Sequence, residues 1–137
     1  MLQLYSDGLT VAAGATIPFN NITYAKGNSA THSAPATTLL NKRGVYLVQV
    51  DAYGSVADAG DFGIQITVNG VPRLDGINKM TTAVGDLASV KTECFVTVAQ
   101  NDCPCNCTSA PTTVQVINPS DVGATDAHYN MIITKIC

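Results

Sequence analysis

The sequence predicts an all-β protein, an antiparallel β-sandwich or jelly roll of about eight to ten strands, on three observations. The 137 residues include 16 threonines and 14 valines, β-branched residues that favour strands. Helix formers are scarce, since Glu93 is the only glutamate and only 12% of residues are charged. Several segments also alternate between apolar and polar side chains, the period of a half-buried strand. Without an internal repeat or a linker, residues 1–137 are expected to form a single domain.

The clearest predicted strand covers Phe62–Asn69, where apolar residues alternate with Gly, Gln, Thr and Asn. Asn69-Gly70 follows directly and supplies two residues that tolerate positive φ, as a type I′ hairpin turn requires. Val71–Leu74 would then begin the return strand. Because Pro72 lacks a backbone N–H, this return strand belongs at a sheet edge or begins there.

Other segments predict further strands with signals of unequal strength. Strong alternation or apolar runs mark Val45–Tyr53, Val90–Val98, Val114–Ile117 and Tyr129–Ile136. Weaker signals place strands at Leu2–Tyr5, Val11–Phe19 and Thr37–Leu40, a loop over Gly27–Thr38, and one helical turn over Thr81–Asp86.

Two of these strands carry apolar residues on both faces. Val45 and Leu47 alternate with the apolar face that begins at Tyr46, and Ile132 and Ile136 alternate with the Tyr129–Ile133 face. A sandwich buries only one face of each strand, so the second apolar face must be covered from outside the sandwich. A covering loop and a neighbouring subunit both satisfy this requirement, and we favour the subunit.

The segment Leu39–Val50 resembles the central signature of the C1q/TNF-like jelly rolls, because a strand and a polar turn lead to Gly44-Val45-Tyr46 and a long apolar strand. The bacterial and phage branch, which includes the C-terminal domain of the spore-surface glycoprotein BclA, is the closer likeness. The Phe62–Leu74 hairpin resembles the next hairpin of that branch, and Tyr129–Ile136 resembles its closing strand. The opening Leu2–Ser6 is similar to that of small proteins in phages of gut Firmicutes.

This resemblance implies a homotrimer around a threefold axis, in which one sheet of each subunit packs against its neighbours while loops or grooves bind partners. The sequence departs from the family in two ways, since it has no Gly-X-Y collagen stalk and no tryptophan, with only 6% aromatic residues. The aromatic seam of many relatives would therefore be replaced by other residues. The seam candidates are Tyr46, Val48, Tyr53, Phe95, Tyr129, Met131 and Ile133.

Five cysteines form the most distinctive local feature, and three of them lie in the run Cys103-Pro104-Cys105-Asn106-Cys107. Zinc sites normally use Cys-x2-Cys pairs, and this spacing differs, so a metal site, disulfides and free thiols all stay open. An odd number leaves one thiol over or pairs it between chains. A bond between this run and Cys137 would pin the last strand. The disulfide or metal candidates are Cys94, Cys103, Cys105, Cys107 and Cys137.

The sequence indicates no catalytic residues, and we expect no enzyme activity. His32 and His128 are the only histidines and show no arrangement with a nucleophile. Asp58, Asp61 and Asp75 could approach one another at one end of the sandwich, but calcium would also need carbonyl ligands. We therefore expect no cofactor, with zinc on thiolates and calcium at these carboxylates left open.

Charge and hydropathy exclude two classes of partner. The net charge is −3 and the basic residues are scattered, so nucleic acid is not an expected partner. No apolar run reaches the roughly 20 residues of a membrane span. The N-terminus has neither the basic nor the apolar region of a signal peptide.

Together these features predict a non-enzymatic trimeric protein of a virion surface: a phage capsid fibre, decoration or adhesion module made in the host cytoplasm. Its partners would be its own copies, other virion proteins and a host-surface glycan or protein. Two alternatives remain: a metal- or redox-active protein that uses Cys94, Cys103, Cys105 and Cys107, and a spore-surface adhesive domain.

Overall fold

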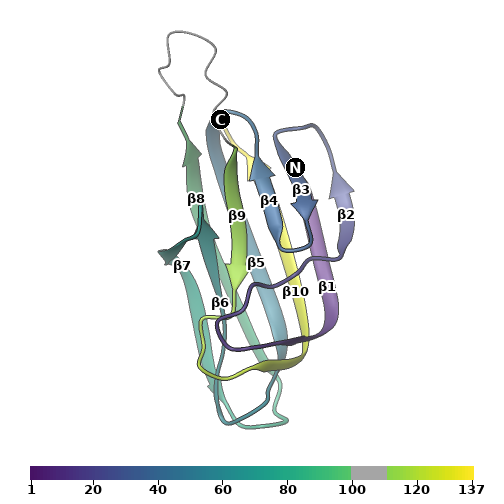
Figure 1. Ribbon diagram of the computed structural model, residues 1–137, viewed down its shortest axis with the longest axis vertical. Coiled ribbons are helices and arrows are strands. Elements are labelled where there is room, and N and C mark those ends of the chain that lie inside the picture. The colour runs from purple at the N-terminus through teal and green to yellow at the C-terminus, as the bar shows by residue number, and fades with distance from the viewer. Residues whose placement is uncertain (100–110) are drawn as a thin grey trace.

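The computed structural model describes residues 1–99 and 111–137, which form two five-stranded antiparallel sheets packed face to face (Figure 1). One sheet has the order β2-β1-β10-β5-β8 and the other β3-β4-β9-β6-β7. The ten strands of the described residues are β1 (Leu2–Val11), β2 (Asn21–Ala25), β3 (Ala30–Ala34), β4 (Thr37–Leu40), β5 (Gly44–Val56), β6 (Gly60–Val68), β7 (Val71–Thr82), β8 (Ala88–Val98), β9 (Thr112–Ile117) and β10 (Ala124–Lys135). These residues contain no helix, and hence none that could cross a membrane.

The predicted all-β sandwich is confirmed, and the predicted β6–β7 hairpin forms as expected. Asn69 and Gly70 have φ values of 51° and 79°, the pair of positive angles that defines a type I′ turn. Pro72 lies in β7, which is an edge strand of its sheet, so the missing N–H costs no ladder hydrogen bond.

The strand predictions fail for strands whose side chains are mostly exposed. β2 is exposed along its whole length and β3 falls inside the segment predicted as a loop, because both are edge strands that bury almost nothing. The predicted strand Val11–Phe19 is wrong: β1 ends at Val11, and the chain then crosses the end of the sandwich with Ile17 and Phe19 buried. The turn predicted over Thr81–Asp86 is not helical, since β7 continues to Thr82.

The core fills the space between the two sheets with the inward side chains of each strand. In β5, alternate residues from Tyr46 to Val56 are buried, and the intervening residues face outward. Tyr46 keeps its hydroxyl satisfied by donating to the Lys42 carbonyl oxygen at 2.7 Å. Gly54 of β5 lies close to the irregular stretch of the neighbouring strand β10, because a Cβ at this position would lie 2.8 Å from the Ala127 Cα.

Candidate functional site

The candidate site is the outward-facing surface of the β2-β1-β10-β5-β8 sheet, which we call the outer face. Its side chains alternate with the buried residues of β1, β5, β8 and β10 and are half-buried or exposed in the single chain. Along those four strands the outer face consists of Gln3, Tyr5, Val45, Leu47, Gln49, Asp51, Tyr53, Ser89, Lys91, Glu93, Phe95, Thr97, His128, Asn130, Ile132 and Thr134.

One end of the outer face is apolar. Strand register places Leu47 of β5 between Thr134 of β10 and Phe95 of β8, with Val45 and Ile132 two residues away along their strands. Phe95 is 57% exposed and the three aliphatic side chains are half-buried. We call Val45, Leu47, Phe95 and Ile132 the apolar patch. Apolar side chains at the outward positions of neighbouring strands form a surface that gains free energy when it is covered.

Hydrogen-bonded polar side chains cross the middle of the outer face. Gln49 donates from Nε2 to Glu93 Oε2 at 3.1 Å, and Asn130 donates from Nδ2 to Asp51 Oδ1 at 3.0 Å. These pairs join β5 to β8 and to β10. Because each amide already has a partner, covering this part of the sheet costs less than burying unpaired polar groups would.

An aromatic stack occupies the opposite end of the outer face. The His128 ring lies between Tyr5 and Tyr53, with ring centroids 6.1 Å and 4.9 Å away and interplanar angles of 24° and 14°. His128 Nδ1 also lies 3.3 Å from Asp7 Oδ1. Sequence reasoning did not predict this stack, because the three rings come from β1, β10 and β5 and meet only through strand register.

The structure divides the predicted seam residues into two groups. Tyr53 and Phe95 lie on the outer face. The other five candidates are fully buried inside the subunit: Tyr46, Val48, Tyr129, Met131 and Ile133. A side chain that is enclosed within one chain cannot also contact a neighbour, so a seam on this sheet must use the alternate residues, such as Val45, Leu47 and Ile132.

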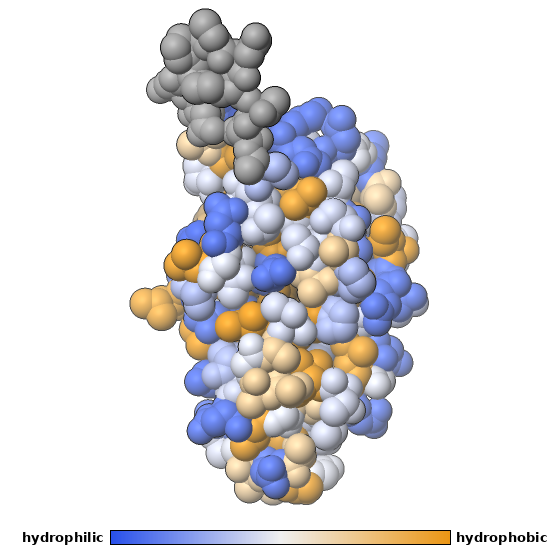
Figure 2. All heavy atoms as spheres, viewed as in Figure 1, coloured by the Kyte–Doolittle hydropathy of each residue, from blue (hydrophilic) through white to orange (hydrophobic). Residues whose placement is uncertain are grey.

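The outward surface of the other sheet differs in chemistry. Its central strands β4, β9 and β6 present mainly Thr and Gln there, for example Thr37, Thr113 and Gln115, with Leu39 and Ile117 as aliphatic exceptions. Figure 2 views the molecule from this side, and apolar groups are scattered among polar ones rather than gathered in one patch. The two outer surfaces are therefore not equivalent.

The cysteine and carboxylate candidates do not converge within the described residues. Cys94 points into the sandwich, where burial raises the pKa of its thiol, whereas Cys137 is exposed. Cys103, Cys105 and Cys107 lie outside the described residues. Over 1–99 and 111–137, no three His, Cys, Asp or Glu side chains are grouped to hold a metal ion.

Three further candidate side chains, those of Asp61, Asp75 and His32, form polar contacts within the chain. Asp61 accepts a hydrogen bond from Thr81 Oγ1 at 2.8 Å, and Asp75 is paired with Arg73. His32 contacts the Phe19 carbonyl oxygen through Nε2 at 2.8 Å. The Asp61 and His32 contacts join segments that are distant in the chain, whereas the Arg73–Asp75 pair lies within β7.

Solved structures with a C1q/TNF-like jelly-roll fold match nearly the whole chain. The globular domain of zebrafish complement 1qA protein has a TM-score of 0.71 at 8% identity, covering 99% of this chain and 96% of that one. PRD1 vertex protein P5 has a TM-score of 0.64 at 15% identity, with coverage of 99% and 96%. Murine APRIL has a TM-score of 0.64 at 9% identity, with 98% of each chain covered.

No protein-family model matches the sequence, and no curated protein is similar to it. At these low identities the structural likeness shows the fold alone. It confirms the predicted C1q/TNF-like jelly roll, while the bacterial branch with BclA stays a prediction.

Proposed function

We propose that this chain is a non-enzymatic structural protein that assembles as a homotrimer through the outer face of its β2-β1-β10-β5-β8 sheet. The observation that carries the proposal is the apolar patch. Val45, Leu47, Phe95 and Ile132 occupy positions that strand alternation turns toward solvent, where the described chain leaves Phe95 exposed and the other three side chains half-buried. The matching positions of the other sheet are mostly polar.

The chemistry of the outer face suits a subunit interface. Interface centres are enriched in aromatic and apolar side chains, and their polar groups are hydrogen-bonded. Phe95 and the aliphatic residues supply the apolar part, and the Tyr5–His128–Tyr53 stack supplies large rings whose geometry is already fixed. The hydrogen-bonded pairs between these two ends enter the interface with partners in place.

We further propose that the trimer belongs to a virion surface, as a phage capsid fibre, decoration or adhesion module. The fold likeness to PRD1 vertex protein P5, a phage virion protein, supports this placement. In this proposal residues 1–137 act as a single domain made in the host cytoplasm. Surfaces away from the seam contact other virion proteins and a host-surface glycan or protein, and neither nucleic acid nor a membrane is a partner.

A matched pair of leucine variants tests the interface. Leu47 lies half-buried on the outer face, and Leu39 lies half-buried on the outward side of β4 in the other sheet. Light scattering at micromolar concentration should give a trimer for the wild type and for Leu39→Asp. Leu47→Asp should give a monomer with an unchanged far-UV circular dichroism spectrum, because a buried charge at the seam lacks a partner.

Two results would count against the interface: a wild-type monomer, or an equal effect of the two substitutions. The virion placement is tested separately, by mass spectrometry of purified phage particles from the host that carries the gene. Finding the chain at a stoichiometric level supports the placement, and its absence from intact particles overturns it.

A further inference from the structure

Charged side chains are segregated between the two ends of the sandwich. The strands run along the long direction of the molecule, so the turns between them fall into two groups at opposite ends (Figure 1). Strand register defines both groups, since it aligns Gly44 with Val98 at one end and Gly54 with Ala88 near the other. The basic end consists of the described residues at 1, 26–29, 41–43, 69–70, 99, 111 and 135–137. The acidic end consists of residues 12–15, 57–61, 83–87 and 118–126.

Four Lys or Arg side chains belong to the basic end, whose described residues include no Asp or Glu. Lys26 follows β2, and Lys135 ends β10. Lys42 and Arg43 lie in the turn before β5, and this turn is close to the end of β10 because Lys135 pairs with Tyr46. All four side chains are exposed, so this end presents four positive charges to solvent at pH 7.

Five Asp side chains belong to the acidic end, which includes no Lys or Arg. They come from the β5–β6, β7–β8 and β9–β10 connections and from the first residues of β6 and β10. The Ala57 N–H donates to the Gly123 carbonyl oxygen at 2.9 Å, which joins the first of these connections to the third. Gly60 pairs with Thr82, which brings the β7–β8 connection to the same end. The residues are Asp58, Asp86, Asp121 and Asp126, which are exposed, and Asp61, which is half-buried.

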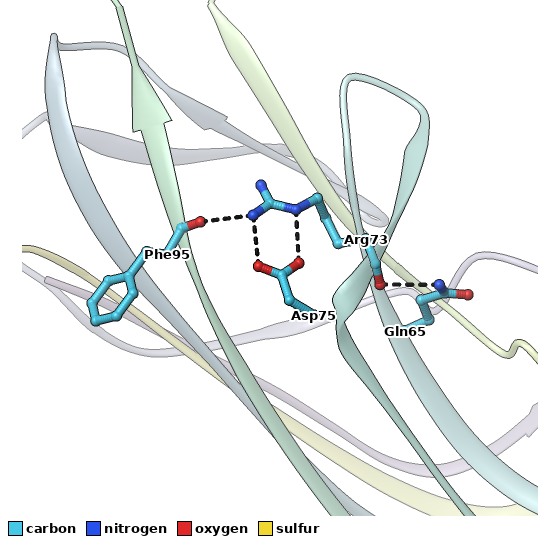
Figure 3. A network of polar contacts seen from close by, with 4 residues as sticks. All are labelled: Gln65, Arg73, Asp75 and Phe95. Atoms are coloured by element: carbon cyan, nitrogen blue, oxygen red, sulfur yellow. Dashed lines mark hydrogen bonds and ion pairs between the residues drawn. The ribbon is translucent and has the colours of Figure 1, made fainter.

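Charges between the two ends are mixed in sign. In β7, Arg73 donates from Nε and Nη2 to the two carboxylate oxygens of Asp75 at 2.9 Å and 2.8 Å (Figure 3). Arg73 Nη2 also donates to the Phe95 carbonyl oxygen at 3.2 Å, and Gln65 donates to the Arg73 carbonyl oxygen at 3.1 Å. The β5–β8 ladder likewise places a lysine opposite an aspartate. The segregation of charge is therefore a property of the ends.

The two ends act as separate charged surfaces at moderate ionic strength. The 13 residues of β5 span the sandwich, a length of about 40 Å at roughly 3.3 Å per residue. Salt at about 0.1 M screens exposed charges beyond about 10 Å. A partner that meets one end therefore interacts with the charge of that end rather than with the net charge of −3.

We propose that copies of this protein associate end to end, with the basic end of one copy against the acidic end of the next. Each end finds its complementary charge on a second copy of the same chain, and electrostatic complementarity selects such partners. The contact joins two different surfaces at opposite ends of the molecule, so it repeats along a line instead of closing. The charge separation is already present in one chain, so this contact goes beyond the proposed trimer and does not depend on it. A threefold axis parallel to the strands keeps like ends together and triples the charge at each end.

Ionic strength tests the contact in the wild type, because exposed ion pairs are individually weak and are screened by salt. Sedimentation velocity at pH 7 in about 1 M NaCl, where charges are screened beyond about 3 Å, should give a single building block, which is three chains if the proposed trimer holds. In about 0.1 M NaCl the average mass should at least double, and the frictional ratio should rise as blocks add in a line.

The outcomes separate this contact from the proposed trimer. A mass of three chains in both salts refutes the end-to-end contact and leaves the trimer standing. A block of one chain at high salt that associates at low salt refutes the trimer and leaves the end-to-end contact standing. A wild type that stays a single block at low salt but binds polyglutamate refutes a second copy as the partner of the basic end.

Charge reversal at each end identifies the two surfaces. We would combine Asp58→Lys with Asp86→Lys in one variant, and Lys26→Glu with Lys42→Glu in another. Each variant keeps only one strongly charged end, so alone it should remain a single block at low salt. An equimolar mixture should form pairs of blocks and nothing longer, because the intact basic end of the first variant meets the intact acidic end of the second.

Lys79 in β7 offers a matched control for the basic end. It is exposed, it pairs with Gly63 between the two ends, and Lys79→Glu changes the net charge as much as Lys42→Glu does. Lys42→Glu should weaken the low-salt association about tenfold, whereas Lys79→Glu should leave it within about threefold. Equal effects of these two substitutions, or normal association of the doubly reversed variants on their own, would overturn the end-to-end contact.

Discussion

Two buried tyrosines of the core differ in whether the hydroxyl has a hydrogen-bond partner. This difference predicts that a Tyr→Phe substitution changes the free energy of unfolding in opposite directions at the two positions. Tyr129 packs against Phe62 with ring centroids 6.3 Å apart, and its buried hydroxyl has no hydrogen-bond partner among the described residues. Tyr46 is equally buried, but its hydroxyl donates to the Lys42 carbonyl oxygen at 2.7 Å. Tyr129→Phe and Tyr46→Phe therefore form a matched pair.

At neutral pH the two variants should move the free energy of unfolding in opposite directions. An unpaired buried polar group costs about 1–3 kcal/mol, so Tyr129→Phe should stabilise the protein by about 1 kcal/mol. Tyr46→Phe removes a hydrogen bond and leaves a carbonyl oxygen without its donor, which should destabilise by about 1–1.5 kcal/mol. The gap between the variants should thus be about 2 kcal/mol.

Alkaline pH separates the variants further. Burial raises the pKa of the Tyr129 phenol above its ordinary value of 10.0, so the folded protein holds this proton when the unfolded chain has lost it. A raised folded pKa gives a contribution that is fully present below pH 10 and declines as the pH rises above it. At pH 11 the wild type should have lost about 1.4 kcal/mol through this group, a loss that Tyr129→Phe avoids.

Urea unfolding at pH 7 and pH 11, with all proteins at the same concentration, measures both effects. Equal concentration matters because association adds to apparent stability. The reasoning is refuted if Tyr129→Phe destabilises as much as Tyr46→Phe at pH 7, or if the gap between wild type and Tyr129→Phe does not widen at pH 11.

Two further predictions follow from the packing of the core. Gly54→Ala should destabilise by about 2 kcal/mol in the same urea assay, because the new methyl group would lie 2.8 Å from the Ala127 Cα on the neighbouring strand β10. A change below about 0.5 kcal/mol would contradict this account of the close approach of β10 to Gly54. Cys94 is buried and the pKa of its thiol is raised, so this thiol should not react with a disulfide reagent at pH 8 until the protein unfolds. Exposed Cys137, in contrast, should react immediately in the reduced protein. Comparing wild type with Cys94→Ala should thus reveal one slow thiol, and equal fast reaction of all thiols would contradict the placement.

The central strands could be predicted from sequence because they are half-buried. In β6, Phe62, Ile64 and Ile66 alternate with small or polar residues, and the Asn69-Gly70 turn marks where the chain reverses. β2 and β3 were missed because they are short strands at sheet edges that bury little of their side chains.

The surface of the sandwich was harder to predict than its strands. Alternation shows that Tyr46 and Val48 share one face of β5 and that Val45 and Leu47 share the other, but it does not say which face turns inward. Both faces are apolar at this end of the strand, so the predicted seam mixed inward residues with outward ones. Only the packing of the second sheet, which covers Tyr46, resolves the choice.

Sequence reasoning did not predict the bulge of β7 opposite Gln65 and Thr67 of β6, or the aromatic stack, for a related reason. The aromatic stack depends on register between β1, β5 and β10, which are distant in the chain, and the bulge depends on a register shift within the β6–β7 hairpin. Arg73 meets the Phe95 backbone because β7 and β8 border the same open edge of the sandwich, and His128 meets Tyr53 through the β10–β5 ladder. Local propensity carries no information on such pairings.

The native mass of the intact chain tests the central claim most directly. Sedimentation equilibrium at micromolar concentration should give about 43 kDa, three times the 14.2 kDa of one chain. A mass of 14.2 kDa that persists as the concentration rises would mean that the outer face stays in contact with water, which would contradict the assembly proposed here.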